Sequence, residues 1–506
     1  MTTIINYNTL NIGDGYALGS SEAVTLLPGY YMASSGANGF TAAAFANRLN
    51  IHGTVAGNVG VQLGQYNLAL GQAGEYLSIG TSGSVTGFIG VEVSGSGNSI
   101  FNAGLIEGND AAISGGFFDS NLPTNAVIAN TGIIHGGDSA IRLLSADQAS
   151  ITNSGTITNS TSPVNGSTQF QFGNLLGAIM VGGTGVHVTN SGAITGVSSI
   201  ENGSLAGGYG VAVEGSGTVV VNSGTITTDS IDTRAAVDLI TTAGQTAQLR
   251  NTGTIQSGAI AVDCGAGNET IINGGTIVGD IVLGDGTDSY DGRGGTLLGQ
   301  VRGGLGDDTY IISDAATEIL EILGQGIDTV RSTVSYSIAS TIEKLILLGS
   351  ADLLGRGNAA SNTVTGNDGD NRLFGFAGGD VISGGNGDDT INGGINRDVM
   401  TGGTGIDRFV FSALADSTVA LPDQIVDFTH NEDLIDLRTI DAKSATVAND
   451  AFTFIGAAAF TSVAGQLRAV VGAVTTITGD TDGNGTADFA IQLNNHAAVT
   501  AIDFLL

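Results

Sequence analysis

Aspartate or asparagine recurs every nine residues, each time after a glycine-rich turn, between Gly366 and Val410. Five nonapeptides run head to tail in this segment: GNDGDNRLF, GFAGGDVIS, GGNGDDTIN, GGINRDVMT and GGTGIDRFV. They approximate the pattern G-G-x-G-x-D-x-U-x, where U is apolar. Glycine allows the positive φ that turns carbonyl oxygens toward an ion, and aspartate supplies the hard anionic oxygen that Ca2+ prefers. The chemistry that these residues predict is the binding of several calcium ions.

Two such nonapeptides make one coil of a β-roll, so sixth-position residues 18 apart should be stacked neighbours. This spacing pairs Asp380 with Asp398, and Asp389 with both Asp407 and Asn371. The apolar residue two places after each sixth position should begin a short strand and point into the roll. The residues expected inside the roll are Leu373, Ile382, Ile391, Val399 or Met400, and Phe409.

The predicted calcium ligands are the turn residues whose carbonyls face the ion and the side-chain oxygens of the repeats. They come from the five nonapeptides and from a similar one upstream, GGLGDDTYI, which begins at Gly303. Two repeats depart from the pattern, because Phe376 and Asn396 stand where glycine is expected. Asparagine tolerates left-handed geometry better than most residues. The predicted set is Gly303, Gly304, Gly306, Asp308, Gly366, Asp368, Gly369, Asn371, Gly375, Gly378, Asp380, Gly384, Asn386, Gly387, Asp389, Gly393, Ile395, Asp398, Gly402, Thr404, Gly405 and Asp407.

A second acidic loop lies near the end of the chain, with the sequence DTDGNGTAD from Asp480 to Asp488. Its alternating oxygens resemble those of an EF-hand loop, so Asp480, Asp482, Asn484 and Asp488 are candidate ligands of one calcium ion. Ile491 occupies the twelfth position, where an EF-hand has a chelating glutamate. An acidic β-turn without an ion is the alternative.

A different repeat precedes these segments, with the pattern asparagine, small residue, glycine, any residue, isoleucine. It follows short apolar or β-branched runs, and its copies are 22 to 37 residues apart, which suits the coils of a parallel β-helix. A strand, an Asn-Gly turn and a second strand are the expected unit. Stacked turns would align the asparagine amides into a ladder, a structural role, while unequal gaps leave loops that could bind a ligand. The copies begin at Asn102, Asn130, Asn153, Asn190, Asn222, Asn251 and Asn273.

The composition is acidic and rich in glycine. The 506 residues carry a formal net charge of −32 and include 82 glycines. Such a charge should repel nucleic acid and bare anionic membrane, and no stretch of apolar residues is long enough to predict a transmembrane helix. Cys264 is the single cysteine, so no disulfide can form within the chain. The first residues show no basic or apolar region of a Sec-type signal peptide.

The C-terminal part resembles the RTX (repeats-in-toxin) proteins that type I systems export from Gram-negative bacteria. Residues 284–365 look like a degenerate continuation of the nonapeptides. DRFVFSALADS from Asp407, DQIVDF from Asp423 and DLIDL from Asp433 resemble the C-terminal domain of serralysin-type proteins. The final residues are similar to the secretion signals of that group, and they are Asp503, Phe504, Leu505 and Leu506.

This resemblance implies export of an unfolded chain by the type I secretion machinery, with folding when the chain meets extracellular calcium. It implies a secreted protein at the cell surface of a Gram-negative bacterium. It does not extend to a protease, because the zincin motif H-E-x-x-H is absent.

The predicted fold is all-β: a right-handed parallel β-helix, then a calcium-binding parallel β-roll and a β-rich C-terminal secretion domain. The predicted domains are an N-terminal cap at 1–45, the β-helix at 46–283, a degenerate RTX-like segment at 284–365, the nonapeptide β-roll at 366–410 and a serralysin-like domain at 411–506.

Parallel β-helices often host polysaccharide-active enzymes, which would need catalytic groups among the residues before 284. The basic residues there are four arginines, which fall in different predicted coils without a local Asp, His or Arg cluster: Arg48, Arg142, Arg234 and Arg250. A glycoside hydrolase needs only two carboxylates, and Asp229, Asp232 and Asp238 are candidates that a polar loop explains equally well. The sequence therefore predicts that the chain is not an enzyme.

A calcium-dependent extracellular structural protein fits these features best. The ends and edges of a solenoid can form head-to-tail contacts between copies, and such contacts give open assemblies when they do not close into a ring. The expected partner is therefore the protein itself, in a surface layer, a filament or a biofilm matrix. Cell-surface polysaccharide is a further candidate partner. A calcium-dependent adhesin that binds glycans or surfaces is the first alternative, and a polysaccharide-active β-helix enzyme is the second.

Overall fold

The computed structural model describes residues 2–5, 10–11, 16–18, 23–28, 30–33, 40–42, 48–63, 74–115, 122–160, 177–201, 204–229, 234–445 and 447–506. The chain forms two compact units, Met1–Leu305 and Gly306–Leu506. Regular structure in the described ranges is strand, apart from the short 3-10 helix η1 (Ala501–Asp503). No helix in these ranges is long and apolar enough to cross a membrane. The predicted all-β class is therefore confirmed.

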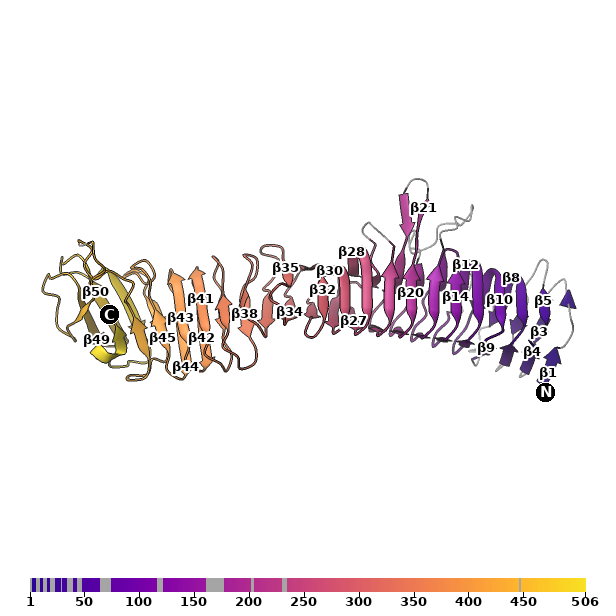
Figure 1. Ribbon diagram of the computed structural model, residues 1–506, viewed down its shortest axis with the longest axis horizontal. Coiled ribbons are helices and arrows are strands. Elements are labelled where there is room, and N and C mark those ends of the chain that lie inside the picture. Colours follow the sequence, from indigo (N-terminus) through magenta and orange to yellow (C-terminus); the bar gives the residue numbers. More distant parts are fainter. Residues whose placement is uncertain are drawn as a thin grey trace. The chain divides into compact units, whose positions relative to one another are not determined.

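The first unit is a parallel β-helix whose coils contribute strands to three stacks (Figure 1). In the first stack each strand pairs in parallel with the strand one coil away, and β16 and β19 align Asn153 with Asn190. The strands of the first stack are β1 (Thr2–Ile5), β4 (Ala23–Leu26), β7 (Arg48–Ile51), β9 (Tyr76–Ile79), β11 (Ser99–Asn102), β13 (Val127–Asn130), β16 (Ser150–Asn153), β19 (His187–Asn190), β24 (Thr218–Asn222), β27 (Thr246–Asn251), β29 (Asn268–Asn273) and β31 (Ser289–Asp291).

The second and third stacks share several long strands that bend from one stack to the next. The second stack contains β2 (Leu10–Asn11), β5 (Tyr31–Ala33), β8 (Thr54–Leu63), β10 (Ser84–Val93), β12 (Leu105–Gly115), β14 (Ile133–Gly136), β17 (Thr156–Asn159), β20 (Ala193–Gly196), β25 (Thr225–Thr228), β28 (Thr254–Cys264), β30 (Thr276–Asp285) and β32 (Thr296–Leu298). The third stack contains β3 (Tyr16–Leu18), β6 (Phe40–Ala42), the second halves of β8, β10, β12, β28 and β30, and β15 (Ser139–Leu143), β18 (Gly177–Gly182), β23 (Tyr209–Glu214), β26 (Val237–Ile240) and β33 (Gln300–Leu305).

The core of the β-helix is built from alternating apolar residues that point inward from each strand. Val188, Ile194 and Val211 belong to successive strands of the three stacks, and all are fully buried. Within the predicted cap at 1–45, the described strand β4 pairs in parallel with both β1 and β7, so it continues the first stack. The run AVTL of β4 alternates buried Val24 and Leu26 with less buried residues, and this period of two is that of a strand.

The predicted asparagine ladder is present and runs along the end of the first stack. Seven buried amides are linked one to the next, with Nδ2 of each donating to Oδ1 of the following asparagine at 2.8 to 2.9 Å. Each turn glycine is also required, because a Cβ on Gly192 would lie 2.1 Å from the carbonyl oxygen of Gly155. The ladder runs through Asn102, Asn130, Asn153, Asn190, Asn222, Asn251 and Asn273.

One antiparallel hairpin leaves the stacks between β20 and β23. It consists of β21 (Ser198–Glu201) and β22 (Ser204–Gly207), and β21 projects from the magenta part of the β-helix in Figure 1. At its base the Ser198 backbone N–H donates to Asp229 Oδ1 at 2.7 Å. Because β22 ends at Gly207 and the third-stack strand β23 begins at Tyr209, the hairpin directly precedes that strand in the chain.

The second unit is a two-sheet parallel β-roll that ends in an antiparallel segment. Roll sheet 1 contains β34 (Thr309–Ile312), β36 (Thr329–Ser332), β38 (Lys344–Leu347), β40 (Thr363–Thr365), β42 (Val381–Asn386), β44 (Val399–Thr404), β46 (Asp423–Ile425) and β51 (Phe489–Leu493). Roll sheet 2 contains β37 (Tyr336–Ser337), β39 (Leu354–Arg356), β41 (Arg372–Ala377), β43 (Thr390–Ile395), β45 (Arg408–Val410), β47 (Leu434–Asp436) and β52 (Phe504–Leu505). The remaining strands are β35 (Glu318–Leu320), β48 (Thr453–Phe454), β49 (Gln466–Val471) and β50 (Thr475–Asp480), and β49, β50 and β51 pair antiparallel.

The nonapeptides fold into coils of two repeats, as their spacing predicts. Strand pairing aligns Leu373 with Ile391 in roll sheet 2 and Ile382 with Met400 in roll sheet 1. These four side chains and Phe409 are fully buried. Of the two alternatives in the fourth repeat, Met400 points inward, because Val399 is only half-buried.

Candidate functional site

Two columns of buried side chains lie at the turns of the β-roll, with one aspartate or asparagine from each repeat. In the first column the backbone N–H of each residue donates to Oδ1 of the aspartate one coil further on. Asn362 donates to Asp380 at 2.7 Å, Asp380 to Asp398 at 2.8 Å and Asp398 to Asp423 at 2.9 Å. The spacing that the sequence predicts for Asp380 and Asp398 is thus the observed one.

The second column runs along the other turn of the roll. The N–H of Asn371 donates to Asp389 Oδ1 at 2.7 Å, Asp389 to Asp407 at 2.9 Å and Asp407 to Asp433 at 2.9 Å. Asn371 differs from the aspartates, because its amide exchanges hydrogen bonds with Asn367. It therefore presents no anionic oxygen at this turn.

In five of the six column aspartates the second carboxylate oxygen is buried without a hydrogen-bond partner, and the sixth, Asp433, accepts from the Thr429 N–H. The five are Asp380, Asp389, Asp398, Asp407 and Asp423. Buried polar atoms are almost always satisfied, and an anionic one without a partner is especially unfavourable. Five such oxygens at regularly spaced turns are what calcium coordination would satisfy.

The first glycine of each repeat makes room for that oxygen. A Cβ at Gly375, Gly384, Gly393 or Gly402 would lie only 2.2 to 2.3 Å from Oδ2 of the aspartate in the same repeat. The glycines of the pattern are therefore required by space beside the carboxylate as well as by backbone geometry. The donor set and its surroundings fit calcium.

Burial changes the acidity of these carboxyl groups. Desolvation raises the pKa of Asp380 and Asp407 to about 6 and that of Asp389 and Asp398 to about 7. It raises the pKa of Asp423 to about 9, with the neighbouring charge of Asp398 adding to the effect. A bound cation would reverse this shift by stabilising the ionised carboxylates.

Other residues of the predicted set lie at the exposed side of the turns. Asn386 Nδ2 donates to Asp368 Oδ1 at 2.7 Å, and Thr404 Oγ1 donates to Asn386 Oδ1 at 2.7 Å, so these side chains bond to one another. The two irregular repeats keep the turn geometry, since Phe376 has φ 81° and Asn396 has φ 82°. Phe376 holds a backbone conformation that favours glycine.

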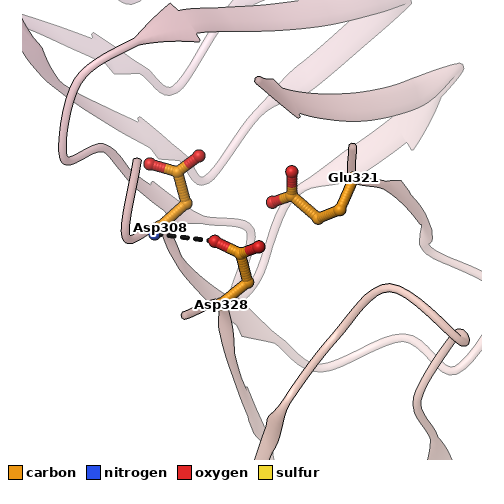
Figure 2. A group of neighbouring side chains, drawn as sticks. All are labelled: Asp308, Glu321 and Asp328. Carbon is orange, nitrogen blue, oxygen red and sulfur yellow. Dashed lines mark hydrogen bonds between the residues drawn. The ribbon is translucent and has the colours of Figure 1, made fainter. Parts of the chain in front are cut away.

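A third acidic group lies upstream of the nonapeptides and contains one predicted residue. Carboxylate oxygens of Asp308, Glu321 and Asp328 lie within 4.8 Å of one another and converge in Figure 2. The Asp308 N–H donates to Asp328 Oδ1 at 3.0 Å, and the Tyr310 hydroxyl donates to Glu321. Burial raises the pKa of Asp328 to about 6. This arrangement could hold a cation.

Sequence reasoning missed Glu321 and Asp328 at this group, and Asp423 and Asp433 in the columns. The segment GIDTV places Asp328 before a valine as in a nonapeptide, which is the signal that could have identified it. Asp423 and Asp433 begin the motifs DQIVDF and DLIDL, where the spacing from the repeats changes from 18 to 25 and 26 residues. Glu321 carries no such signal, because it follows β35 outside the period.

The acidic loop near the C-terminus brings three of its four predicted residues together. Carboxylate oxygens of Asp480, Asp482 and Asp488 lie within 4.8 Å of one another. Local donors already occupy them, since Gly483 and Gly485 N–H donate to Asp480, and Thr481 donates to Asp488. Asn484 donates to Asp482 instead of joining the group, and Ile491 is buried in β51.

The last residues are part of the fold of the second unit. Asp503 is fully buried, and its carboxylate accepts hydrogen bonds from Thr500 N–H at 2.6 Å and Asn431 N–H at 3.0 Å, with His430 Nδ1 2.9 Å away. Burial opposes ionisation of Asp503, but these partners outweigh it and lower its pKa. Phe504 in β52 packs against Phe454 with ring centroids 5.1 Å apart.

The β-helix contains two charged clusters that the sequence did not predict. Arg142 forms an ion pair of 2.5 Å with Asp110. Arg234 Nη1 donates to the Tyr209 hydroxyl at 3.1 Å, in a group that includes Asp238. The expectation that the arginines lack local partners is wrong, because coil stacking joins residues that are 25 to 32 positions apart. Of the other loop candidates, Asp229 caps the hairpin base and Asp232 lies outside the described residues.

Comparison with known protein families finds a match for the C-terminal half of the chain. The family described as peptidase M10 serralysin C terminal matches residues 251–506. The chain belongs to this family. It is therefore a calcium-binding RTX-repeat protein of a secreted family.

Two curated relatives match short segments of the chain. The metalloprotease AprA of Pseudomonas entomophila (strain L48) is 41% identical over 97 residues, and the endo-1,3-1,4-beta-glycanase ExsH of Rhizobium meliloti (strain 1021) is 34% identical over 67 residues. These matches cover 19% and 13% of this chain, and the chain spans only 19% and 14% of the length of those relatives.

Two solved subunits of an Azotobacter vinelandii mannuronan C5-epimerase, AlgE6R2 and AlgE6R3, are also similar in part. Each match covers 31% of this chain, with 92% and 80% of the subunits covered, identities of 22% and 23%, and TM-scores of 0.22 and 0.17.

These relatives correct one expectation. The prediction that the chain is not an enzyme is contradicted, because the relatives AprA and ExsH are a metalloprotease and a glycanase.

Proposed function

We propose that the protein is a calcium-dependent extracellular protein that assembles with further copies of itself on or near the cell surface. The observation that carries this proposal is the pair of aspartate columns whose Oδ2 atoms are buried without partners. Calcium concentrations outside cells suit weak sites of this kind, whereas cytosolic calcium would leave them unfilled. Folding of the second unit is therefore coupled to export.

Export by a type I system of a Gram-negative bacterium is part of the proposal. Asp503 and Phe504 belong to the predicted secretion signal, and both are buried in the folded second unit. A signal that is buried after folding must be recognised before folding. Low calcium inside the cell would keep the β-roll unfolded and the signal accessible.

Assembly is supported by the shape and surface of the units. The asparagine ladder gives the β-helix a continuous hydrogen-bonded spine, as a rigid building block requires. On the β-roll, the large apolar side chains of Phe376, Ile395 and Ile406 are 46% to 53% exposed. These side chains are the proposed contacts of a surface layer, filament or matrix, with cell-surface polysaccharide as anchor.

Electron microscopy of the purified chain with and without calcium tests the assembly. We expect ordered sheets or filaments with millimolar calcium and none after chelation. Phe376→Asn removes an apolar contact and suits the positive φ at this position, so it should abolish assembly without loss of folding. Val447→Asn, at a fully exposed residue, is the control and should assemble normally.

Two outcomes would contradict the proposal. The chain could remain monomeric at every concentration with calcium bound, or Phe376→Asn could assemble as the unmodified chain does. Calcium-dependent attachment of monomers to polysaccharide-coated beads would favour the adhesin alternative instead.

A further inference from the structure

The outer face of roll sheet 2 presents arginines without an acidic side chain from β39 to β45. Leu373, Ile391 and Phe409 point into the roll and are fully buried, so the residues on either side of each point outward. Strand pairing, seen for β41 and β43 in the orange part of Figure 1, stacks these outward residues in two rows. We name the two rows the arginine face, and they contain Leu354, Arg372, Thr390 and Arg408, and Arg356, Phe374, Asn392 and Val410.

The charge of this face is opposite to that of the chain as a whole. The chain has 47 acidic residues against 15 lysines and arginines. The arginine face instead has three arginines and no acidic residue among its eight members. It is therefore a local positive strip on an acidic protein, and such a strip attracts anionic ligands.

Two of its arginines are available to a ligand. Arg356 and Arg372 are exposed, and neither is in ion-pair contact with a carboxylate of the residues that the structure describes. Arg408 Nε lies 4.0 Å from Asp436 Oδ2, which Arg438 also contacts at 2.8 Å, so the positive strip ends at β45. The Arg356 guanidinium lies over the Phe374 ring, 5.8 Å from its centroid, and this contact holds it against the sheet.

A groove lies at the first strand of the arginine face. Its volume of about 660 Å³ is within the range of small-ligand sites. Leu354 and Arg356 line it, together with Ser337 and with Glu318 and Leu320 of β35. The groove thus combines hydrogen-bonding groups for sugar hydroxyls with apolar groups for the carbon face of a sugar ring.

We propose that the arginine face binds a linear polyuronate, a polysaccharide with one carboxylate per sugar, and that the groove holds the sugars at one end of the bound segment. The inference rests on the proposed function, because it specifies the cell-surface polysaccharide that anchors the chain. Arg356 and Arg372 bind carboxylates through paired N–H donors, and Phe374 packs against a sugar ring. Arg372 and Arg408 are two strands apart, about 10 Å, which is comparable to the repeat of two sugars in an extended chain.

The form of the face favours a polymer over a second copy of the chain. Its residues repeat at the strand spacing, so a ligand with a short repeat of its own meets similar contacts on successive strands. Its apolar members Leu354, Phe374 and Val410 are half-buried. The face therefore lacks the protruding apolar anchors that the centres of protein–protein interfaces bury.

Fluorescence anisotropy with the full chain in millimolar calcium tests the proposal. The probe is a labelled hexamer of 1,4-linked galacturonate, which is too short to gel with calcium, and its methyl ester is the matched neutral probe. We expect the acid to bind and the methyl ester to bind far more weakly. Added sodium chloride should weaken binding of the acid, because salt screens exposed charges.

The double variant Arg356→Gln/Arg372→Gln locates the binding. It should weaken binding of the acid by about tenfold, the combined effect of two exposed charged contacts. Arg331→Gln/Arg397→Gln removes the same charge at two exposed arginines outside the arginine face, and it should bind as the unmodified chain does. All four positions are exposed, and far-ultraviolet circular dichroism verifies that both variants are folded.

The proposal is overturned if the unmodified chain binds neither probe or binds both equally, or if the two double variants bind the acid with equal affinity. Loss of assembly in Arg356→Gln/Arg372→Gln with binding of the acid retained would show that the face contacts a second copy instead. Electron microscopy of the same samples separates the two proposals. A chain that assembles with calcium but binds no acid contradicts the polyuronate site alone, whereas a monomeric chain that binds the acid contradicts assembly alone.

Discussion

At the scale of single residues, the decisive atoms are the Oδ2 oxygens of the roll aspartates. Oδ1 of each carboxylate already accepts a backbone N–H from the neighbouring coil, while Oδ2 is buried without a partner. An ionised group in that position is unfavourable until a cation arrives. The same residue therefore aligns the coils and makes the alignment depend on calcium.

Asp389→Asn separates these two roles. The asparagine keeps an Oδ1 acceptor for the Asn371 N–H but removes the anionic oxygen, so calcium should bind more weakly while coil alignment survives. We expect the calcium concentration at half-maximal folding to rise by about tenfold or more, in keeping with the strength of charged ligands. Asp388→Asn, at the exposed neighbour, is the matched control. Circular dichroism during calcium titration measures these midpoints. Equal midpoints for the two variants would argue against Asp389 as a ligand.

The raised pKa values predict an inverted pH dependence for the calcium-free chain. Asp389 and Asp398 have pKa values of about 7 when folded, and unfolded aspartate titrates near 3.9. Between these limits the folded state holds more protons than the unfolded state, so its stability falls as pH rises from about 4 to 7. In chelator, circular dichroism should therefore show a larger folded fraction of the roll at the lower end of this range than at its upper end. With calcium bound the trend should reverse, because protons compete with the ion.

At the scale of elements, repeat spacing determines which side chains meet. The Asn-Gly turns carry their register in the sequence, because each asparagine occupies the same place relative to an isoleucine that points inward. The ladder and the 18-residue coils were therefore predictable. Glu321 was not, because it lies outside the repeat period. The contact of Arg234 with Tyr209 was not either, because these residues come from coils of unequal length that no local pattern aligns.

Asn190→Ala tests the ladder. The substitution removes the acceptor of the Asn153 amide and the donor to Asn222 Oδ1, both 2.8 Å away in the buried spine. The buried Asn222 Oδ1 loses its side-chain donor, and the Asn153 amide keeps only its backbone acceptors Gly155 and Ala193, so the free energy of unfolding of the β-helix should fall by about 2 kcal/mol. Chemical denaturation provides the measurement. Asn109→Ala, at an exposed position of the same unit, should change it little, and equal losses in both variants would refute a special role of the ladder.

At the scale of the whole molecule, calcium and hydrogen-bonded side chains stabilise different units. The first unit has its asparagine ladder and a core of stacked apolar side chains, while the turns of the second contain a regular series of unsatisfied carboxylates. The formal net charge of −32 adds self-repulsion that bound calcium would relieve. Removal of calcium should therefore act on one unit and spare the other.

Hydrogen exchange followed by mass spectrometry tests this claim most directly, with the full chain in calcium and in chelator. Chelation should abolish amide protection in β40 to β45 of the roll, and added calcium should restore it. The strands of the asparagine ladder, β11 to β29, should stay protected in both conditions. Protection of the roll that is unchanged by chelation would contradict the account.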